Sequence, residues 1–316
     1  MKLSAPIAFA RRCDASGGIA VGAEQWVGAN DEDNILRLYS TAGGAPEDDR
    51  LLVLDEFLEI EGEPDQREAD LESATAFGDL VFWIGSHSQS RKGRDRLNRH
   101  RIFATKTVLA GGVATRIEGY GKPCKTLRSA LVKEPRLKKY SLEEAILLPP
   151  KDPGGFNIES LCADLACQRL WLGLRNPIPT GGALLVPLEN PRKLVEDASA
   201  PLFADPLLLD LGGLGFRDMI MTAEGYLILA GDFRDRNTAG AQPSALFTWS
   251  GPGGTLRRLD LDFGDLNPEA LIAFPRGRVL LVSDDGARLT GGQKCKDVAE
   301  EQRSFRAVWL EHWKSP

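Results

Sequence analysis

The sequence predicts an all-β protein, a five-bladed β-propeller closed by its N-terminal strand. A pattern of two apolar runs separated by a turn occurs five times, about every 55 residues, which is typical of propeller blades. The 316 residues include 33 glycines and 19 prolines, so turns interrupt the chain too often for a long helical bundle. The segment 3–11 precedes the first repeat and is available to complete the last one.

Each repeat begins with a small or acidic residue, and its second apolar run ends at a glycine or serine. The repeats begin at Ser16, Glu72, Glu159, Asp218 and Glu269, and their second runs end at Gly28, Gly85, Gly173, Gly231 and Ser283. Third strands are expected at 35–40, 101–108, 183–188, 244–250 and 305–312, and fourth strands at 51–58, 113–120, 207–211 and 256–263. Because the fifth repeat lacks a fourth strand, segment 3–11 fills that place and removes an exposed sheet edge.

One interval between repeats is longer than the others by about 30 residues. Within it, segment 124–152 has helix formers, leucines at i, i+4 spacing and a start at Ser141 that is typical of a capping box. We therefore expect one propeller domain over residues 1–316, with a helical insertion at about 124–152. The insertion either decorates the side of the propeller or acts as a lid or partner-binding surface.

The composition indicates a cytoplasmic protein without membrane association. Lys and Arg number 39 and Asp and Glu 45, so the net charge is −6 and no global field attracts nucleic acid or an anionic membrane. The apolar stretch at the N-terminus is too short for a secretory signal. The five cysteines include no C-x-x-C pair, and with three histidines they predict reduced structural thiols and no zinc site.

The first residues of the repeats are the predicted metal ligands. The innermost strand of each blade begins on the face where the second strand ends, so these residues should converge at one mouth of the channel. Carboxylates that close raise one another's pKa, and a hard cation, Ca²⁺ (or Mg²⁺), would compensate them. The predicted ligands are Ser16, Glu72, Glu159, Asp218 and Glu269. Alternatively, these acids pair with Arg175 and Arg217, or they are solvated and cap backbone amides.

The loops after the second strands lie on the same face and carry the other predicted site residues. His87 is the only histidine at a position that the repeat defines, and His87 or Asp31 is predicted to activate water, although a structural role for the histidine stays open. The predicted substrate-binding residues are Arg175, Arg217, Arg91, Arg94, Asn176, Asp232 and Asp284. A glycosidase pair of Glu72 and Glu159 would depend on their separation.

The segment 91–101, which we call the basic loop, is the strong basic run in this acidic chain. Guanidinium groups bind phosphate or carboxylate bidentately, which suits an anionic substrate. The alternative is a solvated loop that pairs with neighbouring acids. A broad basic field and interleaved aromatic residues are missing, which argues against nucleic acid.

Three long motifs resemble an uncharacterised bacterial β-propeller family described as a domain of unknown function. They are DLES…FWIGSHSQSRKGR…NRHRIFA, GFNIESL…RLWLGLRNPIPTGGALLVPLENP and LDLGGLGFRDM…YLILAG, and the resemblance covers nearly the whole chain. It implies the propeller fold and no particular reaction. The predicted ligand positions are also similar to those of the five-bladed calcium-dependent apyrases and, distantly, the esterase-like phytases. The aspartate at position 218, beside Arg217, departs from that ring of serine and glutamates.

These observations favour a metal-dependent hydrolase that acts on a phosphoester or similar anionic small molecule. A non-catalytic propeller that binds a ligand or an unidentified protein, with a structural metal ion or none, is the alternative. A third hypothesis is a gluconolactonase-like hydrolase of sugars or lactones, which would not need the basic loop. Because one fold supports many activities, the site must decide among them.

Overall fold

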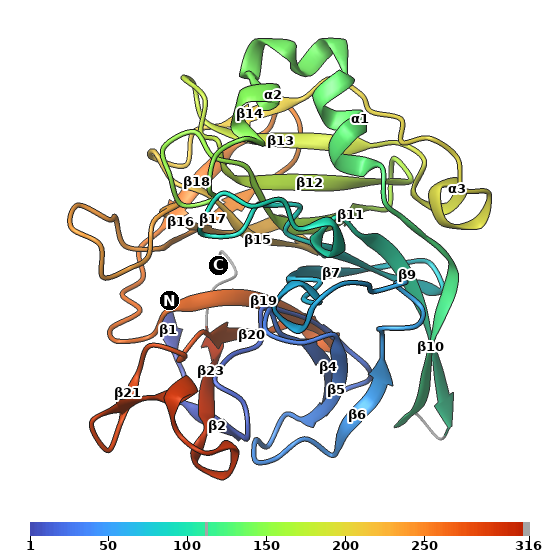
Figure 1. Cartoon of the computed structure of the whole chain (residues 1–316). Helices are drawn as coiled ribbons and strands as arrows, with labels where there is room; N and C mark the ends of the chain where they lie inside the picture. The colour runs from blue at the N-terminus through green and yellow to red at the C-terminus, as the bar shows by residue number, and fades with distance from the viewer. Residues whose placement is uncertain (111–112, 312–316) are drawn as a thin grey trace.

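The computed structural model describes residues 1–110 and 113–311 and confirms a five-bladed β-propeller (Figure 1). Blades 1 to 4 are each a sheet of four antiparallel strands in chain order. Blade 1 contains β3 (Gly17–Ala20), β4 (Gln25–Ala29), β5 (Ile35–Ser40) and β6 (Asp48–Val53). Blade 2 contains β7 (Leu71–Phe77), β8 (Leu80–Gly85), β9 (Ile102–Ala110) and β10 (Val113–Cys124). Blade 3 contains β11 (Asn157–Asp164), β12 (Arg169–Asn176), β13 (Ala183–Leu188) and β14 (Leu207–Leu209), and blade 4 contains β15 (Gly215–Thr222), β16 (Gly225–Gly231), β17 (Ala245–Trp249) and β18 (Leu256–Leu259).

Blade 5 joins the two ends of the chain, as predicted. Its strands from the C-terminal part are β19 (Pro268–Phe274), β20 (Arg278–Ser283) and β23 (Ser304–Glu311). The closing segment is split into β1 (Lys2–Leu3) and β2 (Ile7–Ala10), and both pair with β23. A small hairpin, β21 (Leu289–Thr290) and β22 (Gln293–Lys294), lies in the loop before β23. His312, the end of the predicted third strand, lies outside the described residues.

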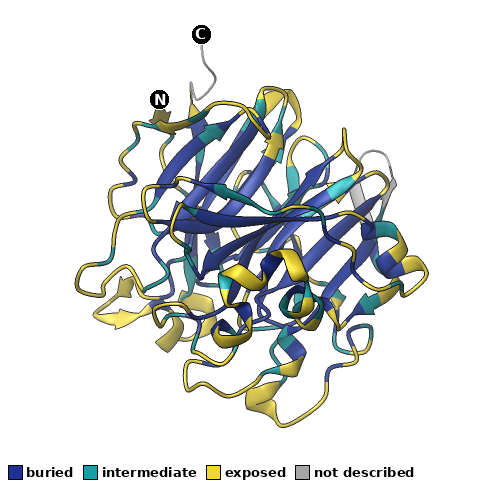
Figure 2. Cartoon of the chain, turned by 90° about the horizontal axis from the view of Figure 1, so that it is seen from above, coloured by how far each residue is buried: buried dark blue, intermediate teal, exposed yellow. Residues whose placement is uncertain are grey.

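The inner strands consist of apolar runs and are buried. All six residues of β8 and all eight of β11 are buried, and Figure 2 shows the buried residues gathered in the strands and the exposed ones in the loops. Blades 5 and 1 are joined by an aromatic cluster in which the ring centroids of Phe9 and Phe305 lie 5.0 Å apart and those of Phe9 and Trp26 5.4 Å apart. Packing as well as strand pairing therefore closes the ring.

A disulfide bond joins Cys13 to Cys295, across a sequence separation of 282 residues. The prediction of reduced thiols was wrong for this pair, because the propeller brings together two cysteines that are far apart in sequence; Cys124, Cys162 and Cys167 are free. Disulfides persist in oxidising compartments, so this bond speaks against the predicted cytoplasmic location. In the described part of the chain, the helices lack the length and apolar composition that a membrane span needs.

The long interval between blades 2 and 3 holds the predicted helical insertion, with α1 (Leu127–Lys133), a 3-10 helix (Pro135–Tyr140) and α2 (Leu142–Ala145). Leu127, Leu131 and Leu142 are buried in the same cluster as apolar side chains of blades 2 and 3. The predicted capping box does not form, since Ser141 has a left-handed backbone and its side chain makes no cap hydrogen bond. A further helix, α3 (Pro191–Glu196), lies between β13 and β14 and was not predicted.

Strand ends account for the other differences. The predicted fourth strand 51–58 corresponds to β6, which ends at Val53. The amide of Leu54 then donates to the Asn34 carbonyl at 2.9 Å and that of Leu58 to the Leu54 carbonyl at 2.8 Å, so this segment turns toward the next blade. Leu54 and Leu58 in the turn are buried, so this segment has the apolar pattern expected of a strand.

Candidate metal centre at the channel mouth

The innermost strands begin on the face where the second strands end, which we call the mouth face. Four of these strands carry a β-bulge close to that end. In blade 2, for example, Leu71 pairs with Gly85 but Ser73 pairs with Ile84, which leaves Glu72 without a partner. Equivalent shifts leave out Glu159, Arg217 and Glu269. A bulge re-aims the side chain of the extra residue, and here four blades each direct one toward a common site.

Three glutamates converge there, one each from blades 2, 3 and 5. Ligand oxygen atoms of Glu72, Glu159 and Glu269 all lie within 4.8 Å of one another. Glu72 and Glu159 are only 9% and 4% exposed. Desolvation, followed by the charge of Glu159, raises the pKa of Glu72 well above its usual value. The site therefore concentrates carboxylate oxygens in a poorly solvated place, which suits a hard cation.

Asp218 does not belong to this group, and the prediction that it is a ligand was wrong by one residue. Asp218 pairs with Leu229 just past the bulge, so Arg217 holds the position in blade 4 that the glutamates hold in theirs. Its carboxylate accepts hydrogen bonds from the Ser73 hydroxyl at 2.9 Å and from the Leu271 amide at 2.8 Å. Asp218 thus ties blades 2, 4 and 5 together.

Ser16 is also engaged elsewhere, because its hydroxyl donates to the carbonyl of Leu71. It lies before β3, a strand whose pairing with β4 is regular from Gly17 onward. Without a bulge, blade 1 does not direct a side chain to the glutamates as the other blades do. The predicted five-membered ring is therefore a cluster of three glutamates with one arginine.

Two arginines neutralise part of this cluster, as the alternative prediction stated. Arg175 Nη1 lies 2.6 Å from Glu159 Oε1, and its Nε donates to the carbonyl of Asp232 at 2.8 Å. Arg217 pairs with Glu269, and its Nε lies 3.9 Å from Glu159 Oε2. Neither guanidinium is free for substrate, which corrects their predicted role.

Unsatisfied oxygens nevertheless remain at the centre. Within the described residues, the carboxylate of Glu72 has no hydrogen bond or ion pair. Glu159 Oε2 is buried without a hydrogen-bond partner, and so is Oδ1 of the neighbouring Asn157. Buried acceptors of this kind are costly unless a ligand completes them. A cation held by the three glutamates would complete the oxygens of Glu72 and Glu159.

His87 does not have the placement that its predicted catalytic role requires. Its side chain is 0% exposed, its Nδ1 bonds to the Gly85 carbonyl at 2.8 Å, and its ring stacks on His100 with centroids 6.0 Å apart. Desolvation, followed by the nearby charge of His100, lowers the pKa of His87 to about 3. A neutral ring that solvent cannot reach is a structural element and not a base for water.

Asn176 and Asp232 are likewise structural, which corrects their predicted substrate-binding role. Asn176 donates to the carbonyls of Pro150 at 2.8 Å and Asp152 at 2.7 Å, and so anchors the end of the insertion. The two carboxylate oxygens of Asp232 bind Arg234 at 2.8 and 2.7 Å. Sequence spacing put both on the mouth face, but their hydrogen-bonding groups are used within the protein.

The basic loop divides into engaged and free residues. Arg99 pairs with Asp70 at 2.8 Å and with Glu68, and Arg101 donates to the Leu58 carbonyl at 3.0 Å. Arg91 and Arg94 are exposed, and no ion pair joins either of them to a described residue. These two are the predicted substrate-binding arginines that stay available.

A second group of acids lies where blades 5 and 1 meet, and we call it the open wall. It comprises Asp14, Asp31, Glu32 and Asp284, none of which forms an ion pair with any part of the chain that the structure describes. Asp31 is exposed at the mouth, but the surrounding protein desolvates it, and with the charges of Asp70 and Asp284 this raises its pKa to about 7. Sequence reasoning missed Asp14, although it stands two residues before Ser16 as Asp70 stands before Glu72.

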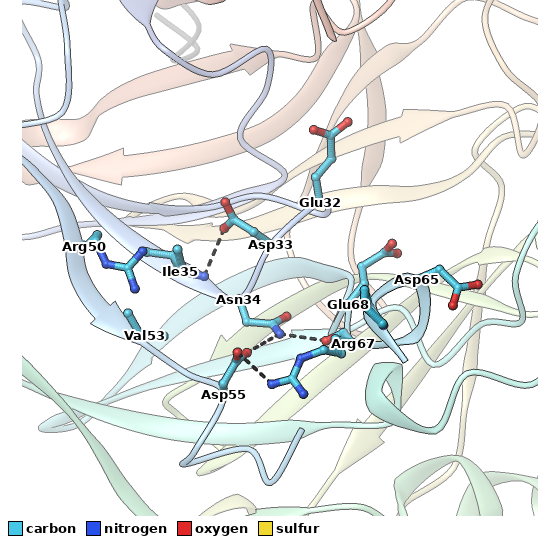
Figure 3. Close-up of a pocket in the computed structure, with 11 residues that line it drawn as sticks. Glu32, Asp33, Asn34, Ile35, Arg50, Val53, Asp55, Asp65, Arg67 and Glu68 are labelled. Carbon is cyan, nitrogen blue, oxygen red and sulfur yellow. Dashed lines mark hydrogen bonds and ion pairs between the residues drawn. The ribbon is translucent and has the colours of Figure 1, made fainter. Parts of the chain in front are cut away.

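A pocket of about 340 Å³ opens beside this wall and was not predicted. It lies between the residues that follow β4 and those that precede β7, and Glu32 and Glu68 are among its lining residues. In Figure 3 hydrogen bonds join Asn34, Asp55 and Arg67, whereas Glu32 has no such bond to another residue drawn. We call it the rim pocket.

Solved structures similar to this chain are propellers of low sequence identity. A glutaminyl cyclase from Myxococcus xanthus is 11% identical, covering 98% of this chain and 95% of its own, with a TM-score of 0.44. A putative oxidoreductase (glucose dehydrogenase) from Thermus thermophilus is 11% identical, with coverage of 98% and 100% and a TM-score of 0.45. A gluconolactonase from Xanthomonas campestris is 12% identical, with coverage of 90% and 76% and a TM-score of 0.41.

These likenesses carry no argument about activity. Among proteins with curated functions, none matches this chain significantly. A family model matches it over residues 14–110 and 105–251, and hence over most of its length. The propeller belongs to the DUF3616 family, proteins of unknown function.

Proposed function

We propose that the protein is a hydrolase that depends on a divalent cation, Ca²⁺ or Mg²⁺, and acts on a phosphoester or similar anionic small molecule. The convergence of Glu72, Glu159 and Glu269 carries this proposal. Carboxylate oxygens are the ligands that these hard cations prefer. Such a cation, when bound, polarises a phosphoryl oxygen and makes water more acidic.

The side chains around the glutamates have the chemistry that the reaction needs. Asp31 is exposed at the mouth with a pKa of about 7, so a large fraction is ionised near neutral pH and accepts a proton from water. Arg91 and Arg94, free on the basic loop, attract the anionic group and orient it. Arg175 and Arg217 position Glu159 and Glu269.

A second candidate is the hydrolysis of a neutral ring, a lactone or sugar derivative. The commitment of Arg175 and Arg217 to glutamates favours it, because the arginines nearest the centre are not offered to an anion. The two candidates differ at the basic loop. Replacing Arg91 and Arg94 by glutamine should raise KM for a phosphoester and leave that for a lactone unchanged.

Cation binding is the direct test. Chelator-treated protein is titrated with Ca²⁺ and with Mg²⁺ by calorimetry, and then assayed with phosphoester and lactone panels. We expect Glu72→Gln to weaken cation binding at least tenfold, and Asp197→Asn, an exposed acid beside α3, to leave it unchanged. No binding of either cation would overturn the proposal. Binding without turnover on either panel would instead indicate a non-catalytic binding propeller.

The disulfide bears on where this function takes place. Because Cys13 and Cys295 are joined, we place the protein in an oxidising compartment. Alkylation of free thiols in protein from freshly lysed cells tests this. Labelling of all five cysteines would contradict it.

A further inference from the structure

We propose that Asn157 and Arg175 determine which cation the three-glutamate site takes. They hold one oxygen of Glu159, so this glutamate offers only its other oxygen and the site takes Mg²⁺, with positions left open for water and substrate. That a cation is bound at all rests on the proposed function. The choice of cation is argued from the contacts that the three glutamates make.

The two carboxylate oxygens of Glu159 have different surroundings. Oε1 accepts hydrogen bonds from Asn157 Nδ2 at 2.7 Å and from Arg175 Nη1 at 2.6 Å. A carboxylate oxygen has two lone pairs, so these two donors occupy Oε1 fully. Oε2 is buried and has no hydrogen-bond partner. Glu159 is therefore able to bind a cation through Oε2 but not to chelate it with both oxygens.

Arg217 indicates that the free oxygen of Glu159 faces the other glutamates. Its Nε lies 3.9 Å from Glu159 Oε2, and its Nη2 contacts Oε2 of Glu269. One guanidinium thus lies beside both carboxylates, and its contact leaves Oε1 of Glu269 for a cation. Glu72 has no hydrogen bond or ion pair among the described residues, so both of its oxygens are available. Together the three glutamates offer three oxygens, or four if Glu72 chelates.

The fold holds Asn157 beside Glu159. Asn157 is 6% exposed and pairs with Asn176 at the start of β11. The pairing of β11 with β12 then shifts twice, which leaves out Arg175 on one strand and Glu159 on the other. The amide of Asn157 has its nitrogen toward Glu159, because the carboxylate would repel its oxygen. Since Asn157 acts through the glutamate, it is a positioning residue.

A site with so few protein oxygens suits Mg²⁺ better than Ca²⁺. Ca²⁺ takes about 6–8 oxygen ligands, and bidentate carboxylates help to supply them. Mg²⁺ takes about six in a rigid octahedron, keeps several waters, and binds through few carboxylates together with substrate phosphate. The oxygens of Glu72, Glu159 and Glu269 leave about two or three octahedral positions for other ligands. The site is therefore open, as catalysis by a bound metal ion requires.

The charge around these positions favours an anionic ligand. Three carboxylates face two guanidinium groups, those of Arg175 and Arg217, so one negative charge remains. A divalent cation reverses the sign of the site, and a phosphoryl oxygen then replaces water at an open position. The two arginines thus favour an anionic substrate through the charge balance, without contacting it.

The test is the ratio of the affinities for the two cations. Chelator-treated protein is titrated with Mg²⁺ and with Ca²⁺ by calorimetry at one ionic strength. We expect the wild-type protein to bind Mg²⁺ at least tenfold more tightly than Ca²⁺. Asn157→Ala frees one lone pair of Glu159 Oε1, lets Glu159 chelate, and should lower that ratio at least tenfold. A general loss of stability would instead weaken the binding of both cations alike.

Asn190→Ala is the matched control. Asn190 is also a buried asparagine of blade 3, but it follows β13 at the end away from the mouth. Its side-chain amide bonds to the backbone of Ala200 at 2.9 Å and of Leu202 at 2.9 Å. We expect this variant to keep the wild-type ratio of affinities. An equal fall of the ratio in both variants would overturn the role of Asn157.

A count of bound water tests the open site on the wild-type protein, whether or not Asn157→Ala folds. Mn²⁺ prefers octahedral oxygen ligands as Mg²⁺ does, and the broadening of its EPR lines in ¹⁷O-enriched water reports its water ligands. We expect about two or three water ligands, and displacement of at least one of them by inorganic phosphate. A single water ligand or none before phosphate is added, or no displacement by phosphate, would overturn the open site.

These measurements separate the inference from the proposed function. A preference for Mg²⁺ that Asn157→Ala lowers, without turnover of any phosphoester, would support the inference while the hydrolase fails. Tighter binding of Ca²⁺, with turnover, would overturn the inference and spare the hydrolase. Absence of binding of either cation would overturn both.

Discussion

The acids at the mouth form two regions with opposite arrangements of charge. The paired acids are matched with arginines from the same face: Glu68 and Asp70 with Arg99, Glu159 with Arg175, and Glu269 with Arg217. The open wall has no such partner among the described residues. Of these pairs, Arg217 with Glu269 joins blades 4 and 5, whereas Glu159 with Arg175 lies within blade 3. The paired acids are therefore compensated within the fold, whereas the charge of the open wall is uncompensated, at a cost in stability.

The largest effect should come from converting the paired region into an unpaired one. Arg217→Leu leaves Glu269 buried without its cation, and we expect the free energy of unfolding to fall by about 3–5 kcal/mol. Urea denaturation measures it. Arg91→Leu, on an exposed arginine, should change the free energy by less than about 0.5 kcal/mol. Equal losses in the two variants would mean that Arg217 does not stabilise the paired acids.

The disulfide should come next, because it holds the open wall at the junction of blades 5 and 1. Replacing Cys13 and Cys295 by serine removes a link across 282 residues, and we expect a loss of about 2–4 kcal/mol in the free energy of unfolding. The control is Cys167→Ser, an exposed free thiol. Unchanged stability of the double variant under oxidising conditions would show that the link adds nothing to closure.

The pH dependence of stability tests the charge state of the acids at the mouth without any mutation. Burial and neighbouring acids raise the pKa of Asp31 to about 7 and of Glu68 to about 8, and burial raises that of Asp218 to about 7. In the unfolded chain these groups have already lost their protons above about pH 5, whereas in the folded protein they still hold them. The free energy of unfolding therefore falls as the pH rises through the pKa values of the folded protein. Below about pH 6.5, His87 acts in the opposite direction, because its folded pKa is about 3.

We therefore expect the Tm of the metal-free protein to rise as the pH is lowered from about 9 to about 6.5. Calorimetric scans at several pH values measure it. Asp31→Asn combined with Glu68→Gln should reduce the slope. A Tm that is constant or falls over this range would show that these acids are ionised in the folded protein.

The smallest effect is expected within the open wall itself. Glu32→Gln removes one of the charges that repel Asp14 and Asp31, and in metal-free protein we expect a gain of about 0.5 kcal/mol. Chemical denaturation at low salt measures it, since salt screens exposed charges. A loss of stability would mean that Glu32 has a favourable interaction in the fold.

The candidate site shows which of its residues a repeat pattern can predict. Beginning each repeat at a small or acidic residue selected Asp218, whereas the residue at the bulged position of blade 4 is Arg217. The same bulges brought Glu72, Glu159 and Glu269 together as expected, because glutamate stands at the bulged position in those blades. Asn176 and Asp232 each form hydrogen bonds to other parts of the chain. Those contacts depend on the paths of the loops, which the repeat does not determine.

By itself, the sequence determined the five blades, the closure by the N-terminal strand and the helical insertion, because apolar periodicity and turn residues are local properties. It also placed the three glutamates, since each stands at the same point of a repeat. Only the tertiary structure decided that Cys13 meets Cys295, that His87 is buried and that the open wall lacks partners. Those facts depend on contacts between residues far apart in the chain. A shift of one residue in strand register changes which side chains, and so which charges, face each other.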